Sequence, residues 1–256
     1  MSQTELVTAP SSQSRELQPT TTPVKTISTP AAHLLSHALP LVVAGYFYLR
    51  FGALVANPVQ TLLLDLFPIA LLQCVQAVVC LPLSKGNAAA DHIKSSTSTK
   101  NIPTRTVNAI LALLLAAFAS LPVFILLVLF GAPLTTHHPQ TLLCAAHFSL
   151  LAVFPLFYTH GIEKQAWWEI GGAMLPFDTV WGTTVGVALG AWLGAVPIPL
   201  DWDREWQKWP VTIVAGMYAG ALFGNLIGRY ILYGKRLKFR PDNEQHQGEE
   251  NLKKTS

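Results

Sequence analysis

Residues 107–132 have the sequence VNAILALLLAAFASLPVFILLVLFGA, which contains no charged side chain. The hydrocarbon core of a bilayer is about 30 Å thick, and a helix needs around 20 mostly apolar residues to cross it. This stretch exceeds that requirement. It therefore predicts a transmembrane helix, and it indicates the fold class of the chain around it.

Five further stretches on either side of this one meet the same requirement. The six predicted spans lie approximately at residues 36–56, 61–83, 107–132, 141–160, 179–198 and 211–233. The chain of 256 residues is 51% hydrophobic and only 12% charged, whereas an average soluble domain is about 25% charged. This composition disfavours a water-soluble globule. The sequence predicts an all-α, polytopic membrane protein with about six transmembrane helices.

Polar segments divide the chain into three regions. Residues 1–32 are rich in Ser, Thr, Pro and Gln and predict a disordered tail, without the basic start and apolar centre of a cleavable signal peptide. Residues 33–233 form the predicted transmembrane domain, interrupted by a polar loop at 84–106, and residues 234–256 form a charged C-terminal tail. The net charge of +3, with no basic patch interleaved with aromatic residues, gives no indication of nucleic-acid binding.

Lysine and arginine are distributed unequally between the two sides of the predicted spans. With six spans both tails lie on one side, which carries thirteen of the 17 Lys and Arg residues, whereas the opposite side carries only Arg204 and Lys208. Positively charged loops favour the cytoplasmic side. Both termini and the loop 84–106 are therefore predicted to be cytoplasmic, and the loop 199–210 is predicted to face the lumen or the exterior.

Glycine recurs every fourth residue in the last two predicted spans. The two series are Gly182, Gly186, Gly190 and Gly194, and Gly216, Gly220, Gly224 and Gly228. Small residues at this spacing line one face of a helix and let two backbones approach closely. Glycine is common in membrane helices, but two series of four in adjacent spans favour tight helix packing. The pattern leaves open whether the two faces meet each other or meet the helices of a partner.

One charge of each sign lies inside the first predicted hairpin. Arg50 precedes the turn at Asn57-Pro58 by about as many residues as Asp65 follows it, so both lie at similar depth. Charges inside a span are costly and are usually paired. A proton or ion pathway is one interpretation. We favour an intramembrane ion pair between Arg50 and Asp65 that locks the hairpin, or snorkelling of the charges to the interface.

Patterns typical of catalysis or metal binding are missing from the sequence. Asp65 is the only acid deep in a predicted span, and there is no Gly-rich phosphate loop, no HExxH and no nucleophile elbow. The loop acids Asp201, Asp203 and Glu205 could hold a cation, but an acidic triplet in a solvated loop is more often a polar surface. We therefore expect no catalytic residue, no metal and no cofactor.

The loop between the last two predicted spans is the most distinctive string, with the sequence PIPLDWDREWQKWP at residues 197–210. With the preceding GAWLGAV at 190–196, it resembles the PIG-F family of glycosylphosphatidylinositol (GPI) anchor biosynthesis proteins, and a fungal member in particular. The motifs Phe177-Asp178-Thr179 and Trp181-Gly182 and the glycine-lined spans extend this likeness. The resemblance covers roughly residues 33–233. Its first half matches mostly in hydropathy and span count.

This resemblance implies a multi-pass protein of the endoplasmic reticulum membrane with a partner role. Family members associate with and stabilise the ethanolamine-phosphate transferases of the PIG-O and PIG-G type, which add phosphoethanolamine to mannoses of the GPI precursor. The chain is thus expected to be a non-catalytic membrane subunit of such a transferase, in contact with membrane lipid and with the GPI precursor. Two alternatives remain open: a membrane-embedded phospholipid head-group transferase that uses Asp201, Asp203 and Arg204, and a lipid transporter.

The loop also supplies the candidate site residues. Contact with a partner or with the glycolipid is expected from its charged and aromatic side chains, namely Asp201, Trp202, Asp203, Arg204, Trp206, Gln207 and Trp209. The alternative is an ordinary interfacial belt, in which the tryptophans are aromatic anchors and the charges hold the loop in water. At the C-terminus, Lys253 and Lys254 resemble a dilysine retrieval signal for membrane proteins of the endoplasmic reticulum.

Overall fold

The computed structural model describes residues 21–83, 102–133, 135–200 and 202–237, which form helices and no strand, in agreement with the predicted all-α class. The α-helices are α1 (Pro30–Ala56), α2 (Pro58–Cys80), α4 (Ile102–Leu129), α5 (His138–Phe148), α6 (Phe154–His160), α7 (Lys164–Gly171), α8 (Thr179–Ala195) and α9 (Val211–Leu226). Short π turns at Ser149–Val153 and Ile227–Ile231 and a 3₁₀ turn at Glu205–Gln207 complete the elements. Most of the predicted tails and of the loop 84–106, together with Asp201, Lys253 and Lys254, lie outside the described residues.

Proline and capping side chains decide where the first two helices begin. Pro30 and Pro58 lie in the first turn of α1 and α2, where the missing N–H of proline is not needed. Thr29 Oγ1 accepts a hydrogen bond from the N–H of Ala32 at 3.2 Å. Asn57 ends α1, and its side chain accepts from the N–H of Gln60 at 3.3 Å to cap α2. The hairpin turns at Asn57-Pro58, as predicted.

Five helical segments within the described residues are long and apolar enough to cross a membrane. They are α1, α2, α4, the continuous segment His138–His160 and the segment Val211–Ile231. The fourth of these joins α5 to α6 through a π turn that ends two residues before Pro155, whose missing N–H cannot complete an α-helical ladder. α8, in the remaining predicted span, has 17 residues, at the lower limit for a transmembrane helix. The count of six spans therefore remains a prediction.

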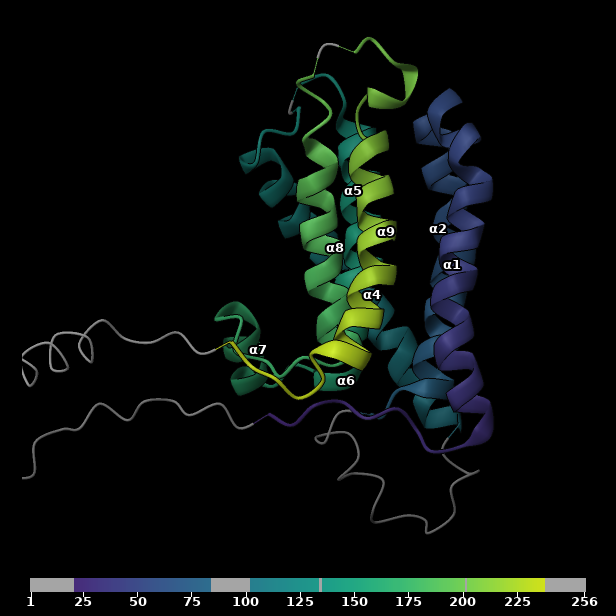
Figure 1. Cartoon of the computed structure of the whole chain (residues 1–256), viewed down its shortest axis with the longest axis vertical. Helices are drawn as coiled ribbons and strands as arrows, with labels where there is room; N and C mark the ends of the chain where they lie inside the picture. Colours follow the sequence, from purple (N-terminus) through teal and green to yellow (C-terminus); the bar gives the residue numbers. More distant parts are fainter. Residues whose placement is uncertain (1–20, 84–101, 134, 201, 238–256) are drawn as a thin grey trace, which may run out of the picture.

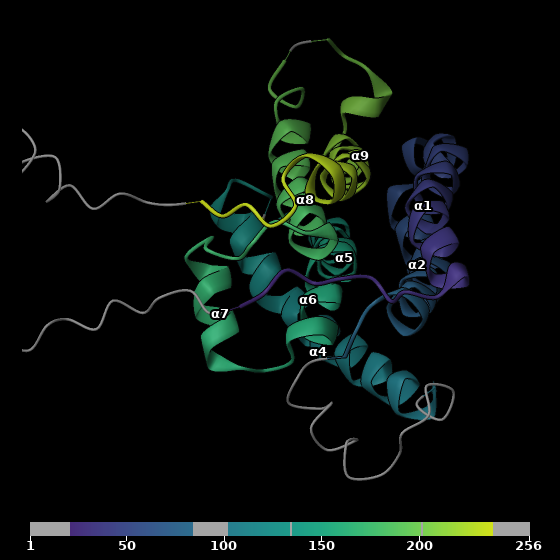
Figure 2. The same ribbon diagram turned by 60° about the horizontal axis from the view of Figure 1, so that its bottom comes forward.

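The long helical segments run alternately up and down in one bundle, with α5 and α6 as one segment and the short α7 at its lower end (Figure 1). The described chain begins and ends at that same end. Seen towards that end, the α1–α2 hairpin lies on one side, the α8–α9 pair with α5 and α6 occupies the middle, and α4 lies outside (Figure 2). The hairpin packs on the rest of the bundle through α1 against α9 and α2 against α5. The loop between α8 and α9 lies at the opposite end from the described chain ends.

The structure differs from the predicted boundary of the N-terminal tail. Residues 21–29 form an extended segment, and α1 already begins at Pro30. The N–H of Ile27 donates to the carbonyl oxygen of Cys80 at 3.0 Å, and the N–H of Val24 donates to Asp178 Oδ2 at 2.7 Å. Fixed acceptors on the folded bundle hold a polar segment that composition alone marks as disordered. At the end of the predicted polar loop, residues 102–106 belong to α4.

Candidate functional site

The two glycine series face each other along α8 and α9, which lie side by side in both views (Figures 1 and 2). A Cβ atom added to Gly190 would overlap the carbonyl oxygen of Gly216, and one added to Gly216 would overlap that of Gly190. The same reciprocal overlap recurs at the pairs Gly186–Gly220 and Gly182–Gly224. The two glycine faces therefore meet each other, which answers the question that the sequence left open.

The outer members of the series meet other backbone atoms. Gly194 faces the carbonyl oxygen of Thr212, and Gly228 faces that of Asp178. Backbone thus lies against backbone from one end of the pair to the other. Because no side chain intervenes, α8 and α9 cannot shift apart without losing this whole contact. The loop that connects the two helices thus begins and ends on a closely packed pair.

Gln207 fastens this loop from within. Its Nε2 donates to the carbonyl oxygens of Pro197 and Leu200, both at 2.8 Å, and its Oε1 accepts the N–H of Arg204 at 2.9 Å. The Gln207 side chain is buried. The prediction that Gln207 is available to a partner is therefore wrong. Its amide is used by loop backbone groups that lack helical hydrogen bonds of their own.

The three tryptophans of the loop differ in exposure. Trp202 is exposed, and its ring meets the half-buried Trp206 ring edge-on, with 5.8 Å between the centroids. Trp209 is half-buried, and its Nε1 donates to Thr141 Oγ1 at 3.1 Å, which ties the loop to α5. Trp209 thus anchors the loop inside the molecule. Trp202 is the most exposed of the three at the end of the bundle, where a membrane interface or a partner would lie.

The charged side chains that the structure describes in this loop are exposed. Asp203 and Arg204 are exposed, and both border a shallow hollow on the loop surface. Asp203 has a φ of 47°, in the left-handed region that Asp tolerates better than most residues. The Lys208 ammonium donates to Glu205 at 2.8 Å, and this hydrogen bond holds the pKa of Glu205 below its usual range. Among the described residues, no group of three or more His, Cys, Asp or Glu could hold a metal ion.

The first hairpin contains the ion pair at the depth that the sequence indicated. Arg50 Nε lies 3.0 Å from Asp65 Oδ1, and the Tyr46 hydroxyl donates to the same oxygen at 2.7 Å. The Asp65 side chain is 9% exposed and that of Arg50 is 34% exposed. Two donors on one buried oxygen compensate the charge of Asp65 within the bundle. This arrangement joins α1 to α2.

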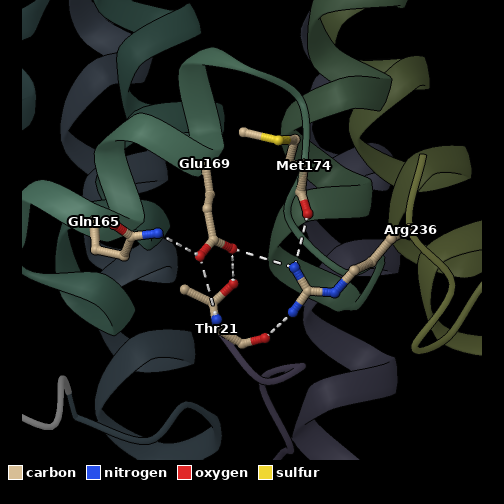
Figure 3. Close-up of polar contacts among 5 residues, drawn as sticks. All are labelled: Thr21, Gln165, Glu169, Met174 and Arg236. Carbon is tan, nitrogen blue, oxygen red and sulfur yellow. Dashed lines mark hydrogen bonds and ion pairs between the residues drawn. The ribbon is translucent and has the colours of Figure 1, made fainter. Parts of the chain in front are cut away.

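At the other end of the bundle, three polar residues distant in sequence form a clasp (Figure 3). Glu169 of α7 is buried, and it accepts hydrogen bonds from both the N–H and the hydroxyl of Thr21 and from Arg236 Nη1 at 3.2 Å. Arg236 also donates to the carbonyl oxygens of Thr21 and, at 2.9 Å, Met174. We call Thr21, Glu169 and Arg236 the basal clasp. It ties the N-terminal segment, α7 and the C-terminal segment together.

Asp178 is a further polar residue that holds this end of the bundle. Its Oδ1 accepts the N–H groups of Val180 and Trp181, both at 2.8 Å, and so caps α8. Its Oδ2 accepts the N–H of Val24. Sequence reasoning used Asp178 only as part of a resemblance, although Asp directly before an apolar run is a signal for a helix start. No such signal exists for the basal clasp, because its members are far apart along the chain.

Comparison with known proteins gives a consistent result. Residues 38–229 match the GPI biosynthesis protein family Pig-F. Glycosylphosphatidylinositol anchor biosynthesis protein 11 of Neurospora crassa is 45% identical over 219 residues, covering 84% of this chain and 80% of the relative. The protein of the same name from Aspergillus fumigatus is 38% identical over 266 residues, covering 89% of this chain and 90% of the relative.

The protein of that name from Pyricularia oryzae is 42% identical over 220 residues, covering 83% of this chain and 81% of the relative. No solved structure matches the chain. The family match runs from within α1 into the π turn that follows α9, across the glycine pair and the loop. These relatives are fungal, as the resemblance predicted. The chain is therefore a membrane protein that belongs to the PIG-F family of GPI biosynthesis proteins.

Proposed function

We propose that this chain is a non-catalytic membrane subunit that binds and stabilises an ethanolamine-phosphate transferase of the PIG-O or PIG-G type, which acts on mannose of the GPI precursor. The names of the relatives support a role in GPI-anchor biosynthesis. The loop between α8 and α9 carries the finer proposal: Gln207 holds its backbone, while Asp203 and Arg204 stay exposed. A preorganised surface loses little entropy on binding, which favours recognition by a protein or a phosphorylated glycan.

The same proposal includes the location and the orientation of the chain. We place it in the endoplasmic reticulum membrane with six spans, both termini in the cytoplasm and the loop in the lumen. The excess of Lys and Arg on the side of the termini supports this orientation. Lys253 and Lys254 would then be readable as a retrieval signal. If replacing both with Ser leaves the protein in the endoplasmic reticulum on fractionation, assembly with partners retains it instead.

Co-purification in mild detergent tests the partner role of the loop. The test variant combines Asp203→Asn with Arg204→Gln, because Asn also tolerates the left-handed conformation of residue 203. The matched control combines Glu205→Gln with Lys208→Gln, which removes an exposed ion pair from the same loop. We expect the test variant to fold and localise normally but to recover at least about tenfold less transferase, or about 1.4 kcal/mol of binding. Equal recovery by both variants would contradict the proposal.

The lipid-linked precursors provide a second measurement in the same cells. If the loop supports the transferase, the Asp203 and Arg204 variant should accumulate precursors that lack terminal phosphoethanolamine. Normal recovery of the transferase together with accumulated precursor would favour contact of the loop with the glycolipid itself. If the Asp203 and Arg204 variant had a normal precursor profile, both transferase support and glycolipid contact by these charges would be excluded.

A further inference from the structure

The extended segment at residues 21–29 crosses the end of the bundle from α7 to the start of α1 (Figure 2). We call it the basal strap. Every third N–H group in it donates to an acceptor on the bundle: Thr21 to Glu169 at 3.3 Å, Val24 to Asp178 at 2.7 Å, and Ile27 to the carbonyl oxygen of Cys80 at 3.0 Å. A period of three residues is typical of a polyproline II helix.

The same period leaves one ridge of the basal strap exposed. Thr22, Lys25 and Ser28 each follow one of the three donor residues, and all three are exposed, whereas the donors themselves are half-buried. In a helix with three residues per turn, side chains three positions apart lie on the same side. Thr22 and Lys25 are therefore both accessible while the strap is docked on the bundle.

Thr22 also begins the sequence Thr-Pro-Val-Lys at residues 22–25. Proline-directed protein kinases accept Thr followed by Pro in an extended chain and favour a cation three residues after the acceptor. Pro23 restricts Thr22 to an extended backbone, and Lys25 supplies the cation. Charge patterns of this kind contribute to the specificity of kinases for their substrates.

A second Thr-Pro pair in the sequence provides an internal comparison. Thr29-Pro30 is the one other place where Ser or Thr precedes Pro. The residue three positions after Thr29 is the buried Ala32, and Pro30 already belongs to α1. Thr29 thus lacks both the cation and the extended chain that accompany Thr22.

We propose that Thr22 is a phosphorylation site for a proline-directed protein kinase. The Thr22 hydroxyl oxygen attacks the γ-phosphorus of ATP, the bond from that phosphorus to ADP breaks, and the hydroxyl proton passes to the carboxylate base of the kinase. The phosphate ester that forms carries a charge of about −1.5 to −2 at pH 7. In cells this step rests on the proposed orientation, because the kinase and ATP act on the cytoplasmic side.

A phosphate on Thr22 would act on the neighbouring basal clasp (Figure 3). Thr21 donates to Glu169, and its carbonyl oxygen accepts from Arg236, which also pairs with Glu169 at 3.2 Å. Phosphate oxygens bind a guanidinium group strongly, and a phosphate repels a carboxylate nearby. Phosphorylation should therefore draw Arg236 away from Glu169 and release the basal strap from the bundle.

Kinase treatment of the purified full chain in detergent tests the site. The probes are ATP and a cyclin-dependent kinase, and peptide mass spectrometry measures the rate at each threonine. We expect phosphorylation of Thr22 to be at least about tenfold faster than that of Thr29. Lys25→Gln should slow the reaction at Thr22, whereas Lys235→Gln, which removes an exposed cation of the C-terminal segment, should not. Equal rates at the two threonines, or no phosphate on Thr22, would overturn the assignment.

Hydrogen exchange measures the release of the basal strap. The amides of Val24 and Ile27 should exchange faster after phosphorylation, while those within α8 and α9 keep their protection. Arg236→Gln should speed the same exchange without phosphate, and phosphorylation should then add little. If Arg236→Gln fails to fold, the wild type and Thr22→Ala, both treated with kinase, decide. Exchange at Val24 and Ile27 that is unchanged in the fully phosphorylated chain would overturn the release.

Both measurements use the pure chain without a transferase. A negative result would therefore overturn the modification and leave the partner role of the loop between α8 and α9, which co-purification tests, unaffected. Chain ends in the lumen would overturn phosphorylation in cells, and protease digestion of sealed microsomes measures their location separately.

Discussion

Asp65 is the residue at which the bundle accommodates a charge. Its Oδ1 accepts from the Tyr46 hydroxyl and from Arg50 Nε, so the carboxylate has two donors within hydrogen-bond distance. A buried ion pair adds little net stability, because desolvation offsets the attraction, but a lone buried charge is strongly destabilising. The pair therefore matters mainly because removing one partner would leave the other charge unpaired.

Asp65→Ala should lower the stability of the protein by leaving Arg50 unpaired. Breaking a buried pair costs about 3–5 kcal/mol, and the cost here should be smaller because the Arg50 side chain is 34% exposed. We expect a lower Tm in detergent, with partial recovery when Arg50→Leu is added. Glu205→Ala, which breaks an exposed pair, is the control and should change little. A double variant as unstable as Asp65→Ala would exclude the pair as the cause.

Asp178 lies outside the spans and offers a test by pH. Burial raises the pKa of Asp178 above its ordinary value of 3.8, and its three N–H donors oppose this shift. A raised pKa means that the folded chain binds the proton more tightly than the unfolded chain. The resulting stabilisation is therefore complete below pH 3.8 and is lost as the pH rises through the raised value.

The comparison variant for this test is Asp178→Asn, which does not titrate but still offers an oxygen to cap α8. Relative to this variant, the wild type should lose free energy of unfolding as the pH rises from below 3.8, and the difference should then become constant. Denaturation of both proteins in detergent across this range measures the effect. A difference that stays constant throughout would show that the pKa is not raised.

At the scale of elements, the α8–α9 pair depends on the absence of Cβ atoms. In an ordinary helix Gly→Ala is stabilising by up to about 1 kcal/mol, because alanine has the higher helix propensity. In this pair a Cβ at Gly190 or Gly220 would overlap a carbonyl oxygen of the neighbouring helix. Backbone cannot move aside as a flexible side chain can, so the steric term should exceed the propensity term.

Gly190→Ala and Gly220→Ala should each lower the Tm of the protein, and the corresponding changes to Leu should lower it further. Overpacking of this kind typically costs about 1–3 kcal/mol. Gly45→Ala is the matched control, because Gly45 lies within α1 and a Cβ there would meet nothing within 4 Å. Thermal unfolding in one detergent ranks the variants. If Gly190→Ala were as stable as Gly45→Ala, the close approach of the two backbones would be refuted.

At the scale of the whole molecule, the first and last described residues lie at the same end of the bundle. The basal clasp and Asp178 hold the segment after residue 20 against α7, the start of α8 and the C-terminal segment. The loop with Asp203 and Arg204 lies at the far end. Ends that share one side of a membrane require an even number of crossings, and the count of six remains a prediction.

Labelling in sealed microsomes tests this arrangement. Epitopes at the two termini should be digested by added protease, whereas a thiol introduced by Arg204→Cys should react with an impermeant reagent only after permeabilisation. The native cysteines provide the background control, since Cys74, Cys80 and Cys144 lie within α2 and α5. Reaction of the new thiol in sealed vesicles would place the loop in the cytosol and overturn the orientation.

The sequence by itself determined the features that depend on local order. Apolar length indicated the membrane class and five helices that the structure contains, Asn57-Pro58 indicated the first hairpin, and the glycine spacing indicated a close helix contact. These could be predicted because hydropathy and helical periodicity act between residues near in sequence. The charged string of the loop pointed to the candidate site in the same way, through residues that are neighbours in the chain.

Only the tertiary structure decided which distant groups meet. It brought the two glycine faces together, turned Gln207 inward, and joined Thr21 to Glu169 and Arg236. The reason is physical: a polar side chain is satisfied by whichever donor or acceptor packing brings within about 3 Å, and that depends on how whole helices are placed.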